Sequence, residues 1–286
     1  MSDVHPVPPS RRQVLAGTIG TGFALAVRPV AASTIITSGE GLDAADVKIP
    51  GEGGPIPGYR AVAAHRKGKA PVVIVVHEIF GLHEHIKDVC RRFAKEGYLA
   101  VAPDLFARQG DATKLTDFKE IQEKIVSRVS DAQVRGDLDA TAAWVKGDHA
   151  ADPARLGLTG FCWGGRHVWL YAAHSPSVKA AVAWYGRLTG PKDAMHPEHP
   201  LDVAATLKAP VEGLYGAQDQ AIPLSSVEEM RKALAAGGPA AKRSTITVFP
   251  DAGHAFHADY RPTYRPQAAA EGWKRALAWF RENGVG

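Results

Sequence analysis

Residues 155–166 read RLGLTGFCWGGR, and this short run decides the fold. Its apolar first half is typical of a buried strand, and its second half begins a helix. Between them lies Gly160-x-Cys162-x-Gly164, the nucleophile-elbow pattern in which a tight strand-to-helix turn lifts a nucleophile above the sheet. Glycine is needed on both sides because larger side chains would collide there. The run therefore predicts a thiol at the carboxyl end of a strand, where the start of the next helix favours negative charge. A glycine-rich turn that only packs or binds phosphate is the alternative.

Apolar strands alternate with amphipathic helices from Tyr59 to the end of the chain. Such alternation, with strands that are apolar nearly throughout, predicts an α/β fold whose mostly parallel, doubly wound sheet carries helices on both faces. The expected strands are residues 59–65, 71–77, 98–104, 155–161, 178–186, 210–216 and 244–250. The expected helices are residues 85–98, 116–128, 131–146, 164–174, 224–236 and 266–284.

The first 32 residues differ in kind from the rest. Arg11 and Arg12 precede an uncharged stretch, residues 15–27, that is too short and too glycine-rich to span a bilayer as a stable helix. Paired arginines of this sort resemble twin-arginine export signals, and small residues before Ser33 suit cleavage. We therefore expect residues 1–32 to be an export signal that engages the export machinery, giving a periplasmic or secreted protein without a stable membrane anchor. A disordered basic tail is the alternative. Residues 33–58 are expected to be a leader of loop and short strand, and residues 59–286 one domain.

Composition excludes several classes of partner. The net charge is +4 over 286 residues, yet no basic run or basic-aromatic patch is present, so we expect no nucleic-acid partner. Cys90 and Cys162 lie too far apart for a disulfide framework or a Cys-x-x-Cys zinc site. Cys90 falls in an amphipathic helix, where packing is its expected role. The sequence favours neither a monomer nor a dimer.

Two further polar residues follow apolar strands later in the chain. Asp219 lies in LYGAQDQAIP and His254 in VFPDAGHAF. The carboxyl ends of parallel strands meet at one edge of a sheet, so both residues are expected beside Cys162. The order nucleophile, acid, histidine is that of α/β-hydrolases, and it predicts a Cys-His-Asp triad. Asp251 is the rival acid, but it lies in the same loop as His254 and is poorly placed to orient that ring.

Five segments together resemble the dienelactone hydrolase family. They are VVHEIFGL, APDLFARQG, GFCWGG, YGAQDQAIP and AGHAFH, and the resemblance runs from Tyr59 to the C-terminus. It implies an α/β-hydrolase fold and a carboxylic-ester hydrolase of carboxymethylenebutenolidase type. Cys162 would be the nucleophile, His254 the base and Asp219 its orienting acid.

The resemblance also implies supporting roles in the segment after the second expected strand. Glu78 would pair with the resting Cys162 or its proton. The backbone amides of Ile79 and Trp163 would form the oxyanion hole.

The expected chemistry is ester or lactone hydrolysis through a thioester, with no cofactor. Thiolate is a strong nucleophile but is easily expelled, so activated esters and lactones are favoured over amides. A metal-dependent hydrolase is one alternative, because histidines and acids crowd two segments, but the spacing of a His-Glu-x-x-His motif is absent. A noncatalytic binding protein on the same fold is the other. The crowded residues are His77, Glu78, His83, Glu84, His85, His254, His257 and Asp259.

The substrate pocket is the least determined part of the site. Aromatic residues near strand ends either wall an acyl pocket or belong to the core. The candidates are Phe80, Trp163, Trp184, Tyr185 and Phe256. The loop-forming residues 187–202 are expected at the pocket rim.

The chain departs from the family where a substrate carboxylate is bound. Relatives carry an arginine four residues after the histidine, and Ala258 stands there. Loss of that clamp predicts a preference for neutral or differently charged esters. Arg108, Arg261 and Arg265 are the candidate replacements, each with an ordinary surface role as its alternative.

Overall fold

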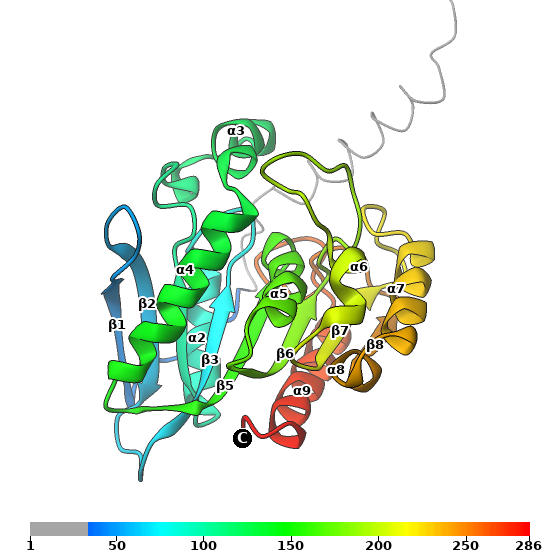
Figure 1. Ribbon diagram of the computed structural model, residues 1–286. Helices are drawn as coiled ribbons and strands as arrows, with labels where there is room; N and C mark the ends of the chain where they lie inside the picture. The colour runs from blue at the N-terminus through cyan, green and yellow to red at the C-terminus, as the bar shows by residue number, and fades with distance from the viewer. Residues whose placement is uncertain (1–33) are drawn as a thin grey trace, which may run out of the picture.

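A mostly parallel sheet of eight strands runs through the computed structural model, which describes residues 34–286 (Figure 1). The spatial order is β1-β2-β4-β3-β5-β6-β7-β8. The pairs β1/β2 and β2/β4 are antiparallel, and the other pairs are parallel. The strands are β1 Leu42–Ile49, β2 Ile56–Ala63, β3 Ala70–Val76, β4 Leu99–Pro103, β5 Ala151–Phe161, β6 Val178–Trp184, β7 Val211–Gly216 and β8 Thr245–Phe249. The α/β fold expected from the sequence is confirmed.

Helices cover both faces of this sheet, as the parallel strands require (Figure 1). Helices α4 (Asp131–Trp144) and α5 (Trp163–His174) pack on one face, and α2 (Glu84–Lys95) and α9 (Pro266–Glu282) on the other. The rings of Phe93 and Trp273, 4.4 Å apart, join α2 to α9. The remaining helices are α3 Phe118–Lys124, α6 Pro200–Val203, α7 Leu224–Ala236 and α8 Pro239–Arg243, and the 3-10 turns are η1 Ala112–Lys114, η2 Val126–Arg128, η3 Val145–Gly147 and η4 Ala204–Thr206.

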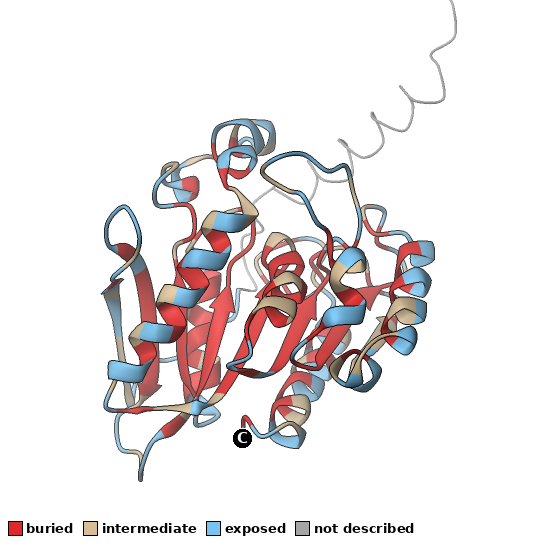
Figure 2. Ribbon diagram, in the orientation of Figure 1, coloured by how far each residue is buried: buried red, intermediate tan, exposed pale blue. Residues whose placement is uncertain are grey.

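The core lies between the sheet and its two helical layers. Figure 2 shows the central strands buried along nearly their whole length, while the outer faces of the helices are exposed. β4 is buried at every residue, and β3 at all but one. Their sequences, LAVAP and APVVIVV, contain no charged residue, which suits strands covered on both sides.

The sheet begins earlier in the chain than the sequence predicts. β1 pairs with β2 from Leu42 opposite Ala63 to Ile49 opposite Ile56. The expected leader, residues 33–58, therefore supplies a full edge strand, and the sheet starts well before the expected boundary at residue 59. The pattern LDAADVKI is hard to recognise because an edge strand needs few apolar residues and tolerates charge.

The expected helix over residues 116–128 is divided in two. Asp117 caps α3 by accepting a hydrogen bond from the Glu120 amide at 2.8 Å, and α3 ends at Lys124. The 3-10 turn η2 follows from Val126. Together α3 and η2 form a small projection above the sheet edge that carries the active-site candidates (Figure 1).

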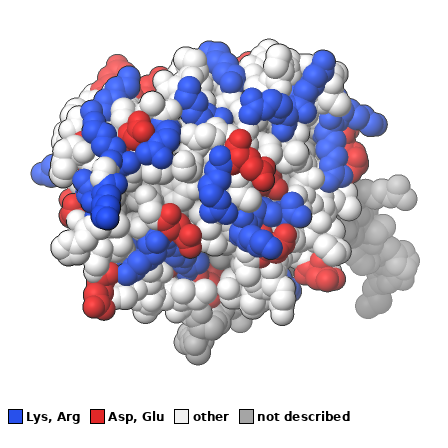
Figure 3. All heavy atoms as spheres, turned by 90° about the horizontal axis from the view of Figure 1, so that it is seen from below, with Lys and Arg blue, Asp and Glu red and all other residues white. Residues whose placement is uncertain are grey.

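Surface properties agree with the charge pattern of the sequence. On the face shown in Figure 3, basic and acidic side chains are interspersed. Within residues 34–286, no helix has both the length and the apolar character that crossing a bilayer requires. The expected export signal lies outside the described residues.

Candidate active site

Cys162 occupies a strained turn between β5 and α5. Its φ of 55° and ψ of −114° lie outside the regions that non-glycine residues favour. A Cβ on Gly160 would lie 2.8 Å from the Gly164 carbonyl oxygen, and a Cβ on Gly164 would lie 2.4 Å from that of Val76. Real Cβ atoms do not approach backbone so closely, so both positions require glycine. The turn has the geometry that the elbow pattern predicts.

Three side chains from separate loops meet at this turn. The Cys162 Sγ atom lies 3.2 Å from His254 Nε2, and His254 Nδ1 lies 2.7 Å from Asp219 Oδ2. Asp219 follows β7 and His254 follows β8. The structure thus brings together the three residues that the sequence order singles out.

The Asp219 carboxylate is fixed by its own loop. It is 5% exposed, and its Oδ1 atom accepts hydrogen bonds from the amides of Ala221 at 2.8 Å and Ile222 at 3.2 Å. This leaves Oδ2 directed at His254. Asp251, the rival acid, is exposed.

The charge on His254 is favoured by its neighbours. Burial lowers the pKa of the imidazole, but Cys162 and Asp219 outweigh burial and raise the pKa of His254 to about 10. The ring is therefore protonated at neutral pH. An imidazolium 3.2 Å from sulfur is placed to stabilise a negative charge on that atom.

Glu78 binds a different partner from the one expected. Its Oε2 atom accepts a hydrogen bond of 2.6 Å from the Tyr260 hydroxyl and lies 3.5 Å from His83 Nε2. No hydrogen bond joins Glu78 to Cys162 in the part of the chain that the structure describes, so the expected pairing of these two residues stays a prediction. Burial would raise the pKa of Glu78, but His83 and the Arg261 charge hold it below its usual range, so the carboxylate is ionised.

Ile79 and Trp163, whose backbone amides are the expected oxyanion hole, line the same site. Ile79 follows Glu78, and Trp163 is the first residue of α5. Both residues line the pocket that contains Cys162. Among the hydrogen bonds of residues 34–286, neither amide donates to a protein acceptor. Both are available to a negatively charged oxygen.

A pocket of about 540 Å³ opens above Cys162 and His254. Volumes of this size suit small organic ligands. The projection of α3 and η2 lines the pocket, as does the loop after β6, which the sequence predicts at the rim. Lining residues include Phe118, Gln122, Val126, Arg166, Tyr185, Arg187, His196, His199 and Ile222. A separate cavity of about 380 Å³ lies between α4 and α5 and contains none of the three side chains.

Of the substrate-binding candidates, Tyr185 and Trp163 line this pocket, whereas Phe80, Phe256, Arg108 and Arg261 are not among its lining residues. Phe256 is fully buried against Trp184, Tyr185 and Phe249. Arg108 is held by Asp137 at 2.6 and 2.7 Å and by the Glu52 carbonyl. Arg261 is 4% exposed, with its guanidinium 4.1 Å above the Phe80 ring. Core packing and local ion pairs thus account for these four residues.

Two arginines that the sequence did not single out do reach the pocket. Arg166 is bound by the Asp131 carboxylate at 2.6 and 2.8 Å. Arg187 is exposed, and within residues 34–286 it has no hydrogen bond or ion pair. Nothing in the sequence shows which arginine is left without a partner, because Asp131 is far from Arg166 along the chain.

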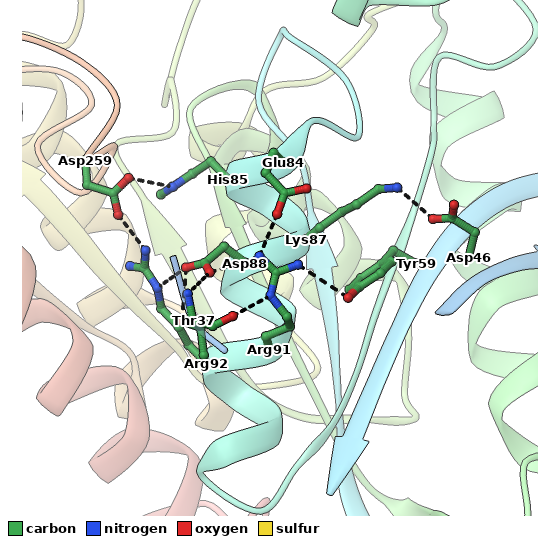
Figure 4. A network of polar contacts seen from close by, with 10 residues as sticks. All are labelled: Thr37, Asp46, Tyr59, Glu84, His85, Lys87, Asp88, Arg91, Arg92 and Asp259. Atoms are coloured by element: carbon green, nitrogen blue, oxygen red, sulfur yellow. Dashed lines mark hydrogen bonds and ion pairs between the residues drawn. The ribbon is translucent and has the colours of Figure 1, made fainter. Parts of the chain in front are cut away.

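The crowded histidines and acids form contacts with one another and with arginines. Figure 4 shows Asp259 between His85 and Arg92. Among residues 34–286, no group of three or more His, Cys, Asp or Glu side chains is arranged to hold a metal ion.

Comparison with known proteins places this site in a family. The model of the dienelactone hydrolase family matches residues 56–284. The chain belongs to the dienelactone hydrolase family. Its Ala258 is fully buried, so the position where the resemblance implies a carboxylate-binding arginine lies in the core.

Members of the dienelactone hydrolase family resemble the chain over most of its length. A protein of Methylorubrum extorquens named "Putative carboxymethylenebutenolidase" is 59% identical over 277 residues, which is 96% of this chain and 94% of that protein. A protein of the same name from Escherichia coli strain K12 is 50% identical over 270 residues, 94% of this chain and 98% of that protein. The crystal structure of a "Putative Dienelactone Hydrolase" from Klebsiella pneumoniae has a TM-score of 0.81 and 52% identity, covering 84% of this chain and 99% of that one.

We expect the rate of Cys162 alkylation by iodoacetamide to change by less than about threefold between about pH 6 and pH 8. The reason is that His254 keeps its proton across that pH range. An ordinary thiol, with a pKa of about 8.5, would react roughly tenfold faster for each pH unit. Mass spectrometry of the Cys162 peptide measures the rate separately from Cys90, which is fully buried. The control is His254→Gln, which should show the steep dependence. A steep dependence in the wild type would contradict a protonated His254 beside the thiol.

Proposed function

We propose that this protein hydrolyses carboxylic esters or lactones, with Cys162 as the nucleophile, His254 as the acid and base, and Asp219 orienting the imidazole. The observation that supports it is the chain of contacts from sulfur to imidazole to carboxylate, 3.2 and 2.7 Å long, at the floor of a 540 Å³ pocket. Fold alone would not support it, because one fold carries many functions.

The reaction would proceed through a thioester. The Cys162 thiolate attacks the carbonyl carbon, and the displaced π electrons move to oxygen, where the amides of Ile79 and Trp163 hold the charge. Collapse of this intermediate breaks the carbon–oxygen bond, and the leaving oxygen takes the proton of His254. A water molecule then attacks the thioester and gives its proton to His254. Collapse of the second intermediate releases the acid and restores the thiolate.

Sulfur chemistry limits the substrates. A thiolate is itself a good leaving group, so the first intermediate goes forward only when the leaving oxygen is also readily expelled. Enol esters, aryl esters and lactones meet this condition. Simple amides do not, because an amine is expelled much less readily than sulfur.

Replacement of Cys162 tests this function directly. We expect Cys162→Ala to lower kcat for p-nitrophenyl acetate by about a thousandfold or more, with little change in thermal melting. Mass spectrometry of wild-type enzyme quenched during turnover should find the acyl group on Cys162. A chelator should leave the activity intact. Substantial turnover by the variant would refute the assignment.

The charge in the pocket supports an anionic substrate. The sequence predicts a neutral or differently charged one because Ala258 stands where the resemblance implies an arginine, but Arg187 supplies an unpaired guanidinium from another loop. Asp131 neutralises Arg166, and Asp193 at the rim contacts His196. A guanidinium without a carboxylate partner is suited to bind one from the substrate.

We expect Arg187→Ala to lower the kcat/KM of p-nitrophenyl hydrogen glutarate about fivefold relative to its methyl-ketone analogue, in which a methyl group replaces the carboxylate oxygen. Arg187→Glu should lower this ratio further. The matched control is Arg135→Ala, which removes another exposed arginine that lines the separate cavity. If the ratio is unchanged in both Arg187 variants, the neutral preference predicted from Ala258 stands.

We also propose that the protein is exported through the twin-arginine route. The support is the sequence of residues 1–32, with Arg11 and Arg12 before a short apolar segment. Fractionation of cells that express the full chain should find a species about thirty residues shorter outside the cytoplasm, and Arg11→Lys with Arg12→Lys should retain the longer form inside. A full-length species inside the cell from the wild-type chain would contradict export.

A further inference from the structure

Three consecutive residues of the loop that carries His254 contact the segment that follows β3. Asp259 is the first. Its carboxylate lies 3.3 Å from His85 Nδ1 and also binds Arg92, so it joins the loop to α2 (Figure 4). We call residues 259–261, with their partners on the β3–α2 side, the 259–261 seam.

Arg261 closes the other end of the 259–261 seam. Its guanidinium lies 4.1 Å above the ring of Phe80, which belongs to the loop between β3 and α2. This contact is a buried cation–π interaction, because Arg261 is 4% exposed. Asp259 and Arg261 therefore both hold the loop that carries His254 against the segment that follows β3.

Tyr260, in the middle of the seam, makes the contact nearest the chemistry. Its hydroxyl donates to Glu78 Oε2 at 2.6 Å, and its ring meets that of His83 at 5.0 Å. Glu78 is 1% exposed and directly precedes Ile79, which lines the pocket. A hydrogen bond to a carboxylate is short and strong, and the Glu78 side of this one is buried.

We propose that Tyr260 is a positioning residue, which fixes the Ile79 amide relative to His254 by holding Glu78 across the seam. The inference rests on the proposed function. One loop carries His254 and Tyr260, and the other carries Glu78 and Ile79, so the Tyr260–Glu78 bond sets the spacing between the base and the oxyanion amide. Glu78 then acts as an anchor for the backbone, in place of the expected pairing with the thiol.

Two reactions of the same thiol separate this role from a general effect on Cys162. Ester hydrolysis passes through an oxyanion and needs the Ile79 amide. Alkylation by iodoacetamide displaces iodide from a saturated carbon, forms no oxyanion and needs only the thiolate. A residue that positions the amide affects the first reaction alone.

The test compares both rates in Tyr260→Phe. We expect kcat for p-nitrophenyl acetate to fall about tenfold or more, with KM changed by less than about twofold, while the alkylation rate of Cys162 at neutral pH stays within about twofold of wild type. The control is Tyr215→Phe, which removes a buried hydroxyl bonded to Trp169 Nε1 at 3.0 Å and should leave the ratio of the two rates unchanged.

A double variant tests whether Tyr260 acts through Glu78. If it does, Glu78→Ala combined with Tyr260→Phe should lose no more hydrolysis than Glu78→Ala alone. Additive losses would overturn the inference.

The remaining outcomes are equally decisive. Hydrolysis that is unchanged in Tyr260→Phe, or that falls together with alkylation, overturns the positioning role. Both results leave the proposed function intact as long as wild-type hydrolysis depends on Cys162. If Cys162→Ala hydrolyses the ester as fast as wild type, the proposed function itself fails, whatever Tyr260→Phe shows.

Discussion

The close backbone contact between the start of α5 and the end of β3 sets the geometry of the whole site. A Cβ on Gly164 would lie 2.4 Å from the Val76 carbonyl oxygen and 2.5 Å from that of His77. In the segment that begins α5, Cys162 lies two residues before Gly164. In the segment that follows β3, Glu78 and Ile79 come directly after His77. Backbone atoms in contact therefore hold the Cys162 turn against the end of β3, and such contacts vary less than side chains held by rotamer preference alone.

Backbone strain is concentrated around the same pocket. Cys162, Tyr185 and Ala255 are the non-glycine residues with positive φ in the described part of the chain, with values of 55°, 39° and 59°. Each lies beyond the carboxyl end of a strand, and Ala255 directly follows His254. Such conformations cost roughly 1–3 kcal/mol each and persist only where the surroundings impose them. Close packing around Gly186 is one such constraint. A Cβ on Gly186 would lie 2.2 Å from the Gly165 carbonyl carbon, so the contact between these two glycines fixes the turn after Tyr185.

The parts of the site that follow from local pattern could be predicted from the sequence, and the parts that depend on side-chain direction could not. Cys162, Asp219 and His254 each follow an apolar strand, and parallel topology brings those strand ends to one edge. Phe256 follows the same strand as His254, yet its ring points into the core. Whether a ring near a strand end faces the pocket depends on packing partners far along the chain. For β1, a short strand was expected within residues 33–58, but its bounds could not be predicted because an edge strand carries few apolar residues.

The two buried carboxylates of the site, those of Asp219 and Glu78, lie near different positively charged groups, and Arg261 is one of those groups. Asp219 contacts His254 and two amides, so its charge favours the imidazolium. Glu78 is also ionised, and an unbalanced negative charge in a low-dielectric site would oppose both a thiolate and an oxyanion. His83, 3.5 Å away, and the charge of Arg261 both lower the pKa of Glu78, and Arg261 is buried and stacked on Phe80. Arg261 lies in the protein interior, whereas Arg187, in the loop after β6, is exposed and lines the pocket.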